Sequence, residues 1–296
     1  MSSDHPLKPY PGPYSAAPGS VADLQRENDA LQDAVAPAQQ RAGSRMPRFR
    51  QAPATYVLLG VNVVVFLWMI LHGVDAISPN PDELVFFGAN YAPFVFGGHQ
   101  WWRVVTAMFV HVGAIHLASN MWCLWNLGVI GEPLLGFFGM AAVYLLTGIS
   151  GNLLSLTFNA PGNVGAGASG AVFGIAGILI VLFSNKRLAE PRPGFRGIPL
   201  EDLKAIRRSV ISFAVLNLLI GVGTLSGSLM HGIHLEGLHI DNLAHIGGFV
   251  FGLLVGLPLI PRMTSGREAY LSRQKVTFAG ALLALALYGY FLSNLQ

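Results

Sequence analysis

The chain carries long apolar runs separated by short polar segments, and the lengths of these runs match the thickness of a lipid bilayer. A helix that crosses the hydrocarbon core of about 30 Å needs about 20 predominantly apolar residues. Runs of this order predict seven membrane-spanning helices, at about 54–72, 113–131, 133–155, 168–184, 209–225, 242–260 and 276–292. The runs lack the apolar/polar alternation of barrel strands, so the pattern predicts an all-α polytopic membrane protein.

The composition points the same way. Hydrophobic residues make up 52% of the 296 residues and charged residues only 11%, whereas a soluble domain carries about 25% charged residues. This balance excludes a soluble cytosolic enzyme, and it excludes intrinsic disorder over most of the length. The single cysteine, Cys123, excludes an intramolecular disulfide and a cysteine-rich metal site.

The positions of Lys and Arg predict the orientation in the membrane. Of the 18 Lys and Arg residues, six precede the first span, seven lie between the fourth and fifth spans, and four lie between the sixth and seventh. With the N-terminus in the cytoplasm and seven spans, all of these face the cytoplasm, which is the positive-inside pattern. Arg103 alone falls on the other side. The net charge of +3 therefore reflects topology, and we expect no nucleic-acid partner.

Three regions follow from these patterns. Residues 1–52 are rich in Pro, Ala, Ser, Gln and charge, which predicts a disordered cytoplasmic N-terminal tail. Residues 53–262 hold the first six spans and form the expected core, and residues 263–296 hold a cytoplasmic linker and the seventh span. The first 25 residues lack the arginines of a mitochondrial transit peptide, so we expect an integral, multi-pass protein of a bacterial inner membrane.

Polar side chains inside three of the spans lie at one depth. His116 and Asn120 are four residues apart on the second span and share one helical face. Ser169 opens the fourth span and His245 lies near the start of the sixth. A helix rises about 1.5 Å per residue, so the height of each residue above the cytoplasmic end of its span can be calculated: ~21 Å for Ser169, ~22 Å for His245 and ~21 Å for His116. In a core of about 30 Å, all three are ~8 Å below the outer surface, which favours a single site.

These residue types suit nucleophilic catalysis. A serine hydroxyl becomes a good nucleophile when an imidazole takes its proton, so Ser169 is the candidate nucleophile and His245 the candidate base. The oxyanion that forms needs preorganised donors, which His116, Asn120 and the backbone N–H of Ser169 can supply. Each residue also has an ordinary interpretation: His245 as a structural histidine bonded to a carbonyl, and His116 and Asn120 as links between helices.

Small residues and one carboxylate accompany these candidates. Small residues recur at every fourth position on the fourth and sixth spans, at Gly170 and Gly174 and at Ala244, Gly248, Gly252 and Gly256. Such ridges let two helix backbones approach closely. Asp241 precedes His245 by four residues and is either an N-cap or a third catalytic member. Its position at the start of the span favours the cap.

Taken together, the motifs resemble those of the rhomboid family of intramembrane serine proteases. The matching residues are Trp102-Arg103, His116-x-x-x-Asn120, Gly167-x-Ser169-Gly170 and Ala244-His245-x-x-Gly248-x-x-x-Gly252. The resemblance implies a six-helix rhomboid-like core followed here by a seventh transmembrane helix. It also implies a Ser169–His245 dyad, His116 and Asn120 on the oxyanion side, and no cofactor or metal. Many bacterial members stack a tyrosine on the catalytic histidine; this chain has Phe173, which keeps the stacking without the hydroxyl.

The implied activity is that of a serine endopeptidase that cuts transmembrane segments near the outer face of the bilayer. Its partners would be single-span membrane proteins and the lipid bilayer itself. The alternative is a rhomboid-like pseudoprotease or chaperone that binds transmembrane helices without cleavage, and the presence of both Ser169 and His245 argues against it. A small-solute transporter would show duplicated halves, and the sequence has no such repeat. The substrate and the oligomeric state stay open.

Overall fold

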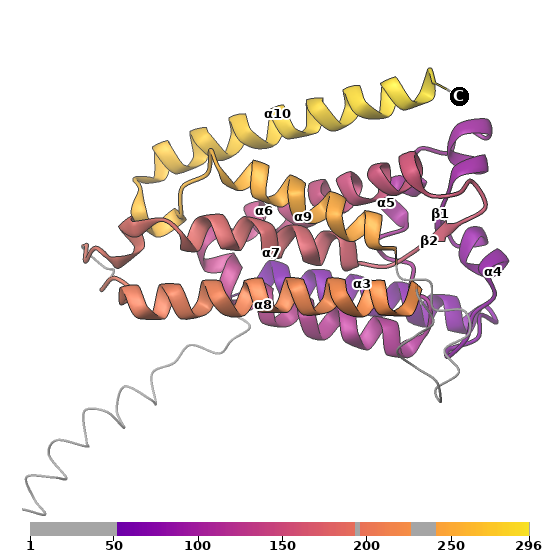
Figure 1. Ribbon diagram of the computed structural model, residues 1–296, viewed down its shortest axis with the longest axis horizontal. Helices are drawn as coiled ribbons and strands as arrows, with labels where there is room; N and C mark the ends of the chain where they lie inside the picture. Colours follow the sequence, from indigo (N-terminus) through magenta and orange to yellow (C-terminus); the bar gives the residue numbers. More distant parts are fainter. Residues whose placement is uncertain (1–51, 193–195, 226–240, 296) are drawn as a thin grey trace, which may run out of the picture. The chain divides into compact units, whose positions relative to one another are not determined.

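A computed structural model describes residues 52–192, 196–225 and 241–295 of the chain. The described residues belong to one unit, Arg48–Gln296, and they are mostly helical (Figure 1). This is an all-α polytopic membrane fold. The tail expected at residues 1–52 lies outside the described residues except for its last residue.

Within the described ranges, long helices carry the fold. They are α3 (Pro53–Leu71), α6 (Ala114–Phe158), α7 (Ser169–Phe183), α8 (Leu200–Leu225), α9 (Asn242–Gly256) and α10 (Arg267–Ser293). Shorter helical segments are α4 (Pro81–Phe86), η1 (Pro93–Gly97), α5 (Arg103–Thr106), η2 (Lys186–Ala189) and η3 (Arg262–Thr264). Two short strands, β1 (Asn90–Tyr91) and β2 (Val164–Gly165), pair in antiparallel fashion.

The second and third predicted spans form the two parts of α6. The helix is interrupted at Gly136, whose φ of 70° and ψ of 171° are not helical, three residues after Pro133. Such an interruption releases carbonyls from the helical ladder. The Leu135 carbonyl accepts hydrogen bonds from the Tyr270 hydroxyl and, at 3.0 Å, from Gln274 Nε2, both on α10. The seventh helix therefore binds the rest of the fold at the turn within α6.

Several helices differ in length from the predicted spans: α10 begins at Arg267, nine residues before the expected 276, and α9 ends at Gly256, four residues before the expected 260. The helix α8 begins nine residues before the expected 209. Its first turns are polar, so an apolar run does not reveal them, and Glu201 and Asp202 suit the N-terminus of a helix. Among the described residues, three helices are long and apolar enough to cross a membrane on their own: Pro53–Leu71, Ala114–Phe158 and Arg267–Leu295. The apolar helices α7 and α9 have 15 residues each, or about 22 Å of helix, because each begins only at the level of the candidate site.

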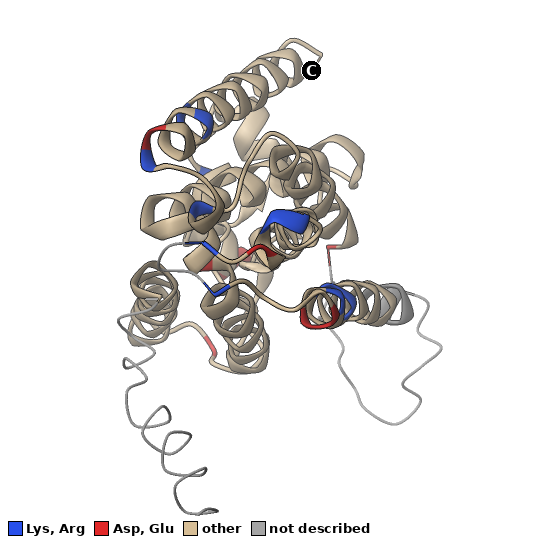
Figure 2. Ribbon diagram, turned by 90° about the vertical axis from the view of Figure 1, so that its left-hand side faces the viewer, with Lys and Arg blue, Asp and Glu red and all other residues tan. Residues whose placement is uncertain are grey.

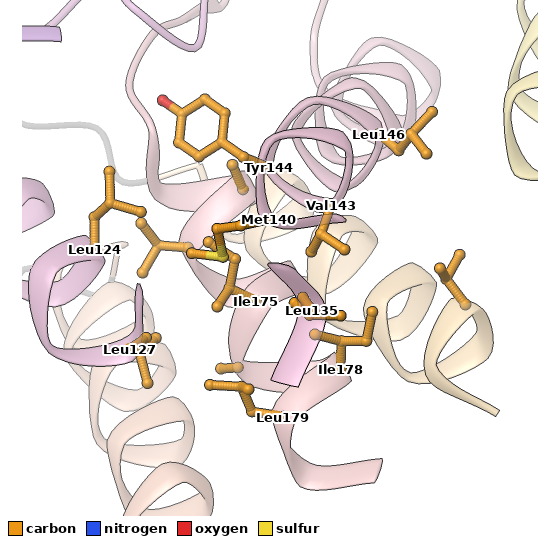
Figure 3. Packing of buried hydrophobic residues seen from close by; sticks show 14 of the residues in the cluster. Leu124, Leu127, Leu135, Met140, Val143, Tyr144, Leu146, Ile175, Ile178 and Leu179 are labelled. Carbon is orange, nitrogen blue, oxygen red and sulfur yellow. The ribbon is translucent and has the colours of Figure 1, made fainter. Parts of the chain in front are cut away.

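The helix α7 lies among the other helices and packs against α6, α8 and α9. Ile175, Ile178 and Leu179 of α7 meet side chains of α6, including Met140 and Val143 (Figure 3). Lipid tails are as apolar as these residues, so close van der Waals packing stabilises the contact. In contrast, α8 and α10 expose many large apolar side chains, as helices that face lipid do.

Basic residues gather at one end of the described helices. All described Lys and Arg residues except Arg103 fall in η2, in η3, in the segment after η2 or in the first turns of α8 and α10 (Figure 2). This is the end where α7 and α9 finish, opposite Ser169 and His245. The distribution is the one that the positive-inside prediction requires, and the orientation itself stays a prediction.

Candidate active site

The candidate nucleophile, Ser169, is the first residue of α7. The turn before it depends on Gly167, which has a φ of +125° that side-chain-bearing residues rarely adopt. A Cβ on Gly167 would also lie 2.6 Å from Cε1 of His116, so no side chain fits there. The N–H of Gly167 donates to the Ala107 carbonyl at 2.9 Å. The backbone before Ser169 is therefore fixed by both conformation and packing.

A second histidine, His111, holds the same turn. Its Nε2 accepts a hydrogen bond from the Ala168 N–H at 3.4 Å, and its Nδ1 lies 3.2 Å from the Phe109 carbonyl. Because Nε2 accepts this bond, the proton of a neutral ring is on Nδ1, which faces the Phe109 carbonyl. None of the sequence motifs above includes this residue. The available signal was a histidine in an otherwise apolar stretch, five residues before His116.

His116 and Asn120 lie near the start of α6 and face the turn at Gly167. The Val112 N–H donates to His116 Nδ1 at 3.4 Å, so in a neutral ring the proton is on Nε2. That Nε2 lies 3.1 Å, and Asn120 Nδ2 lies 3.5 Å, from the position a Cβ on Gly167 would take. Asn120 Nδ2 is buried without a hydrogen-bond partner among the described residues. Two donors therefore face the turn that leads to Ser169.

His245 lies in the first turn of α9 and is 6% exposed. Its ring stacks on Phe173, with 4.3 Å between ring centroids and an interplanar angle of 11°. Phe173 is four residues after Ser169, so both share one face of α7. The imidazole thus lies on the face of α7 that carries Ser169. No hydrogen bond joins these two side chains in the described structure, and His245 Nδ1 is buried without a partner there.

Close contact between α7 and α9 brings the two side chains together. A Cβ on Gly248 would lie 2.8 Å from the carbonyl carbon of Gly170, and a Cβ on Gly252 would lie 2.9 Å from that of Gly174. A Cβ on Gly170 would lie 3.1 Å from the Ala244 carbonyl oxygen. The ridges of small residues expected on the two spans therefore face each other, and they leave space only for hydrogen atoms.

Asp241 is the N-cap of α9. Its Oδ1 accepts a hydrogen bond from the Ala244 N–H at 3.0 Å, and its carbonyl accepts one from the His245 N–H at 3.2 Å. The carboxylate makes no hydrogen bond to the His245 ring, whose Nδ1 has no partner in the described structure. Of the two roles considered for Asp241, the geometry is that of the cap.

The segment between α3 and α6 is anchored by Arg103, which is 4% exposed. Its Nη1 donates to the carbonyls of Val85 and Ala89 at 2.6 and 3.1 Å. Next to Ala89, Asn90 of β1 pairs with Gly165 of β2, and β2 leads directly to the turn before Ser169. Arg103 therefore stabilises the segment that contains β1, and β1 in turn pairs with the strand β2 that precedes Ser169.

The described residues contain no group of three or more His, Cys, Asp or Glu side chains that could hold a metal ion. Cys123 is a free, half-buried thiol three residues after Asn120. The polar side chains grouped at the site are the serine, the histidines and the asparagine, which are residue types that carry out proton transfer and nucleophilic attack.

The sequence is similar to those of known proteins. The family model described as "Rhomboid domain" matches residues 98–262, which include every candidate residue. The chain is 31% identical over 209 residues to "Rhomboid protease GluP" of Bacillus subtilis, covering 69% of this chain and 35% of that protein. It is 27% identical over 255 residues to "Rhomboid protease AarA" of Providencia stuartii, covering 81% and 83% respectively.

A plant protein, "RHOMBOID-like protein 1" of Arabidopsis thaliana, is 28% identical over 197 residues, which cover 64% of this chain and 42% of that protein. The chain thus spans between a third and a half of the length of several curated relatives that it matches.

Proposed function

Since the chain belongs to the rhomboid family, we propose that it is an intramembrane serine endopeptidase in which Ser169 is the nucleophile and His245 the general base. The observation that carries the proposal is the placement of the His245 ring. It stacks on Phe173, one helical turn from Ser169 and on the same face of α7. His116 and Asn120 face the turn before Ser169 from α6.

The proposed reaction begins when His245 takes the proton of the Ser169 hydroxyl as Oγ attacks the carbonyl carbon of the scissile peptide bond. The carbonyl oxygen becomes an oxyanion, which accepts hydrogen bonds from His116 Nε2, Asn120 Nδ2 and the Ser169 N–H. The protonated His245 then gives its proton to the leaving amine, and an acyl-enzyme remains. Water, deprotonated by His245, releases the acyl group and restores Ser169.

A dyad fits this site better than a triad. The buried Nδ1 of His245 has no partner in the described structure, and Asp241 is engaged elsewhere. In place of a carboxylate, the stacked ring of Phe173 orients the imidazole of His245. The unpartnered Nδ2 of Asn120 suits a donor that gains its acceptor only when the oxyanion forms, which is how a preorganised site lowers a barrier.

We expect substrates to be single-span membrane proteins that are cut near the outer end of the span. The estimated depth of Ser169, ~8 Å below the outer surface of a core of about 30 Å, sets this position. A regular helix shields its carbonyls in hydrogen bonds, and each freed group costs several kcal/mol in lipid. The cut segment should therefore hold Gly, Pro or another helix-weakening residue, with a small residue donating the attacked carbonyl.

The proposed organisation is a catalytic core of residues 53–262 with the N-terminus in the cytoplasm, a tail of residues 1–52 before it, and a linker and seventh helix in residues 263–296. A bacterial inner membrane is the proposed location. Family membership supports an integral membrane protein, and the positions of Lys and Arg support the orientation.

Two alanine variants test the activity. Ser169→Ala and His245→Ala should each abolish cleavage of a model single-span substrate in proteoliposomes, because nucleophile and base act as a unit. Ser184→Ala is a matched control: Ser184 caps the other end of α7 and should leave cleavage unchanged. Full activity of purified Ser169→Ala would refute the mechanism. Wild-type protein that binds the substrate without cutting it would favour the non-proteolytic alternative.

The substrate prediction has its own test. Leucine at every helix-weakening position of a cleaved span should abolish the cut, because the helix can then no longer unwind at Ser169. Mass spectrometry of the products locates the cleavage site. Unchanged cleavage of the all-leucine span, or cleavage at its cytoplasmic end, would contradict the depth and unwinding arguments.

A further inference from the structure

The carboxylate of Asp241 connects two helices at the candidate site. Its Oδ1 accepts from the Ala244 N–H of α9 at 3.0 Å and from Asn159 Nδ2 at 3.1 Å. Its Oδ2 accepts from the Ser155 hydroxyl at 2.5 Å. Asn159 follows the last residue of α6 and also donates to Ser155 Oγ at 2.9 Å. One side chain therefore joins the end of α6 to the first turn of α9.

This carboxylate also lies close to the segment that leads to the nucleophile. A Cβ on Gly165 would lie 3.3 Å from Asp241 Oδ2. Gly165 belongs to β2 and precedes Ser169 by four residues. Asp241 itself precedes His245 by four residues, which is about one helical turn. The carboxylate thus belongs to the start of the helix that carries His245 and lies close to the strand that leads to Ser169.

The hydrogen bonds of Asp241 show how it acts. They involve backbone and polar side chains of α6 and α9 and leave the His245 ring out. Because Asp241 does not touch the reacting atoms, it can affect the reaction by fixing the position of the backbone that carries His245. One turn further along, the Ser150 hydroxyl donates to the Gly247 carbonyl at 3.2 Å, so α6 and α9 have a second link there. In the first turn of α9, which carries His245, the side-chain hydrogen bonds that link α9 to the end of α6 are those of Asp241.

We propose that Asp241, held by Ser155 and Asn159, is a positioning residue that sets the location of His245 relative to Ser169 by clamping the start of α9 to the end of α6. The inference rests on the proposed function of the same site. It assigns Asp241 an indirect role, in contrast to a third catalytic member that would hold the imidazole itself.

Substitutions at Asp241 separate the two roles. Asp241→Ala removes the cap and the clamp, and displacement of a reacting group by about 1 Å costs on the order of 100-fold in kcat. Asp241→Asn keeps a good cap, and its amide can donate to Ser155 Oγ, so kcat should stay within about tenfold of wild type. KM should change little in either variant, and the pH profile of kcat in Asp241→Asn should match that of wild type.

A structural control comes from the same end of α6. The hydroxyl of Thr157 lies 2.6 Å from that of Tyr288 on α10, so Thr157→Ala also removes a hydrogen bond between helices. Thermal unfolding in detergent should show a loss of stability for both Thr157→Ala and Asp241→Ala. Only Asp241→Ala should lose kcat. Ser155→Ala and Asn159→Ala, which each remove one donor to the carboxylate, should fall between wild type and Asp241→Ala.

The outcomes distinguish this inference from the proposed function. If wild type cleaves the substrate and Asp241→Ala cleaves it at the same rate, positioning by Asp241 is refuted while the protease remains. Equal losses of kcat in Thr157→Ala and Asp241→Ala would also refute it. A loss of about 100-fold or more in Asp241→Asn, with a shifted pH profile, would instead assign Asp241 a direct catalytic role. Wild type without cleavage, by contrast, would refute the proposed function itself.

Discussion

Gly248→Ala should separate α7 from α9 and reduce activity far more than it reduces the amount of folded protein. The added Cβ would lie 2.8 Å from the carbonyl carbon of Gly170 and closer still to its oxygen. Non-bonded carbon atoms prefer about 3.5–4.0 Å, so the helices must move apart by about 1 Å. The neighbour is backbone, which cannot rotate away as a side chain could. The whole start of α9 must therefore shift.

The cost of this shift can be estimated. Overpacking typically costs about 1–3 kcal/mol, and replacing a helical glycine by alanine returns about 0.5–1 kcal/mol. The net loss of stability should therefore be at most about 2.5 kcal/mol. His245 precedes Gly248 by three residues, so it moves with the helix. A displacement of about 1 Å should lower kcat by about 100-fold.

Gly280→Ala in α10 is the matched control for this prediction. A Cβ there meets nothing within 4 Å, so the variant should be as stable as wild type or more stable by up to about 1 kcal/mol. Its turnover should equal that of wild type. The assay is substrate turnover in proteoliposomes, with thermal unfolding of the purified protein alongside. Equal turnover and equal unfolding temperatures for Gly248→Ala and Gly280→Ala would refute the close-contact argument.

Further variants test other parts of the site and fold. His116→Ala and Asn120→Ala should each lower kcat by about 10–1000-fold, because one of several oxyanion donors is lost; a steady-state assay showing no change in either would remove them from the site. Phe173→Tyr should retain turnover and Phe173→Leu should lose it, because the aromatic ring, whose centroid lies 4.3 Å from that of His245, orients the imidazole by stacking. Equal turnover in both variants would contradict this role. Glu132→Gln should lower stability by about 1–3 kcal/mol, because the Glu132 carboxylate accepts three hydrogen bonds of 2.8 Å from the first turn of α3; an unchanged unfolding temperature would oppose it.

Features that depend on local sequence could be predicted. Hydropathy alone placed every predicted span on a helix, because a bilayer requires apolar length from each helix separately. The shared face of His116 and Asn120 follows from helical periodicity. Helix rise predicts similar depths for Ser169 and His245, and for this reason the sequence could relate residues of separate spans. The stacking partner, Phe173, came from the family resemblance and has the expected contact with His245.

Features that depend on long-range contacts could not be predicted. Glu132 binds backbone N–H groups 77 and 78 residues away, and His111 binds that of Ala168, 57 residues away. No periodicity relates such partners, since their proximity is created by the packing of the helices. The same holds for Ser155 and Asp241, 86 residues apart. From the sequence, Asp241 could be assigned only roles within its own span, as an N-cap or as a third catalytic member beside His245.

The central claim is that Ser169 is an activated nucleophile, and covalent labelling tests it most directly. Purified wild-type protein should react with a fluorophosphonate, which phosphonylates a serine only when a base and an oxyanion site activate it. Peptide mass spectrometry should place a single adduct on Ser169, and His245→Ala should abolish it in folded protein. Absence of the adduct from folded, wild-type protein, or an adduct on another serine, would contradict the account.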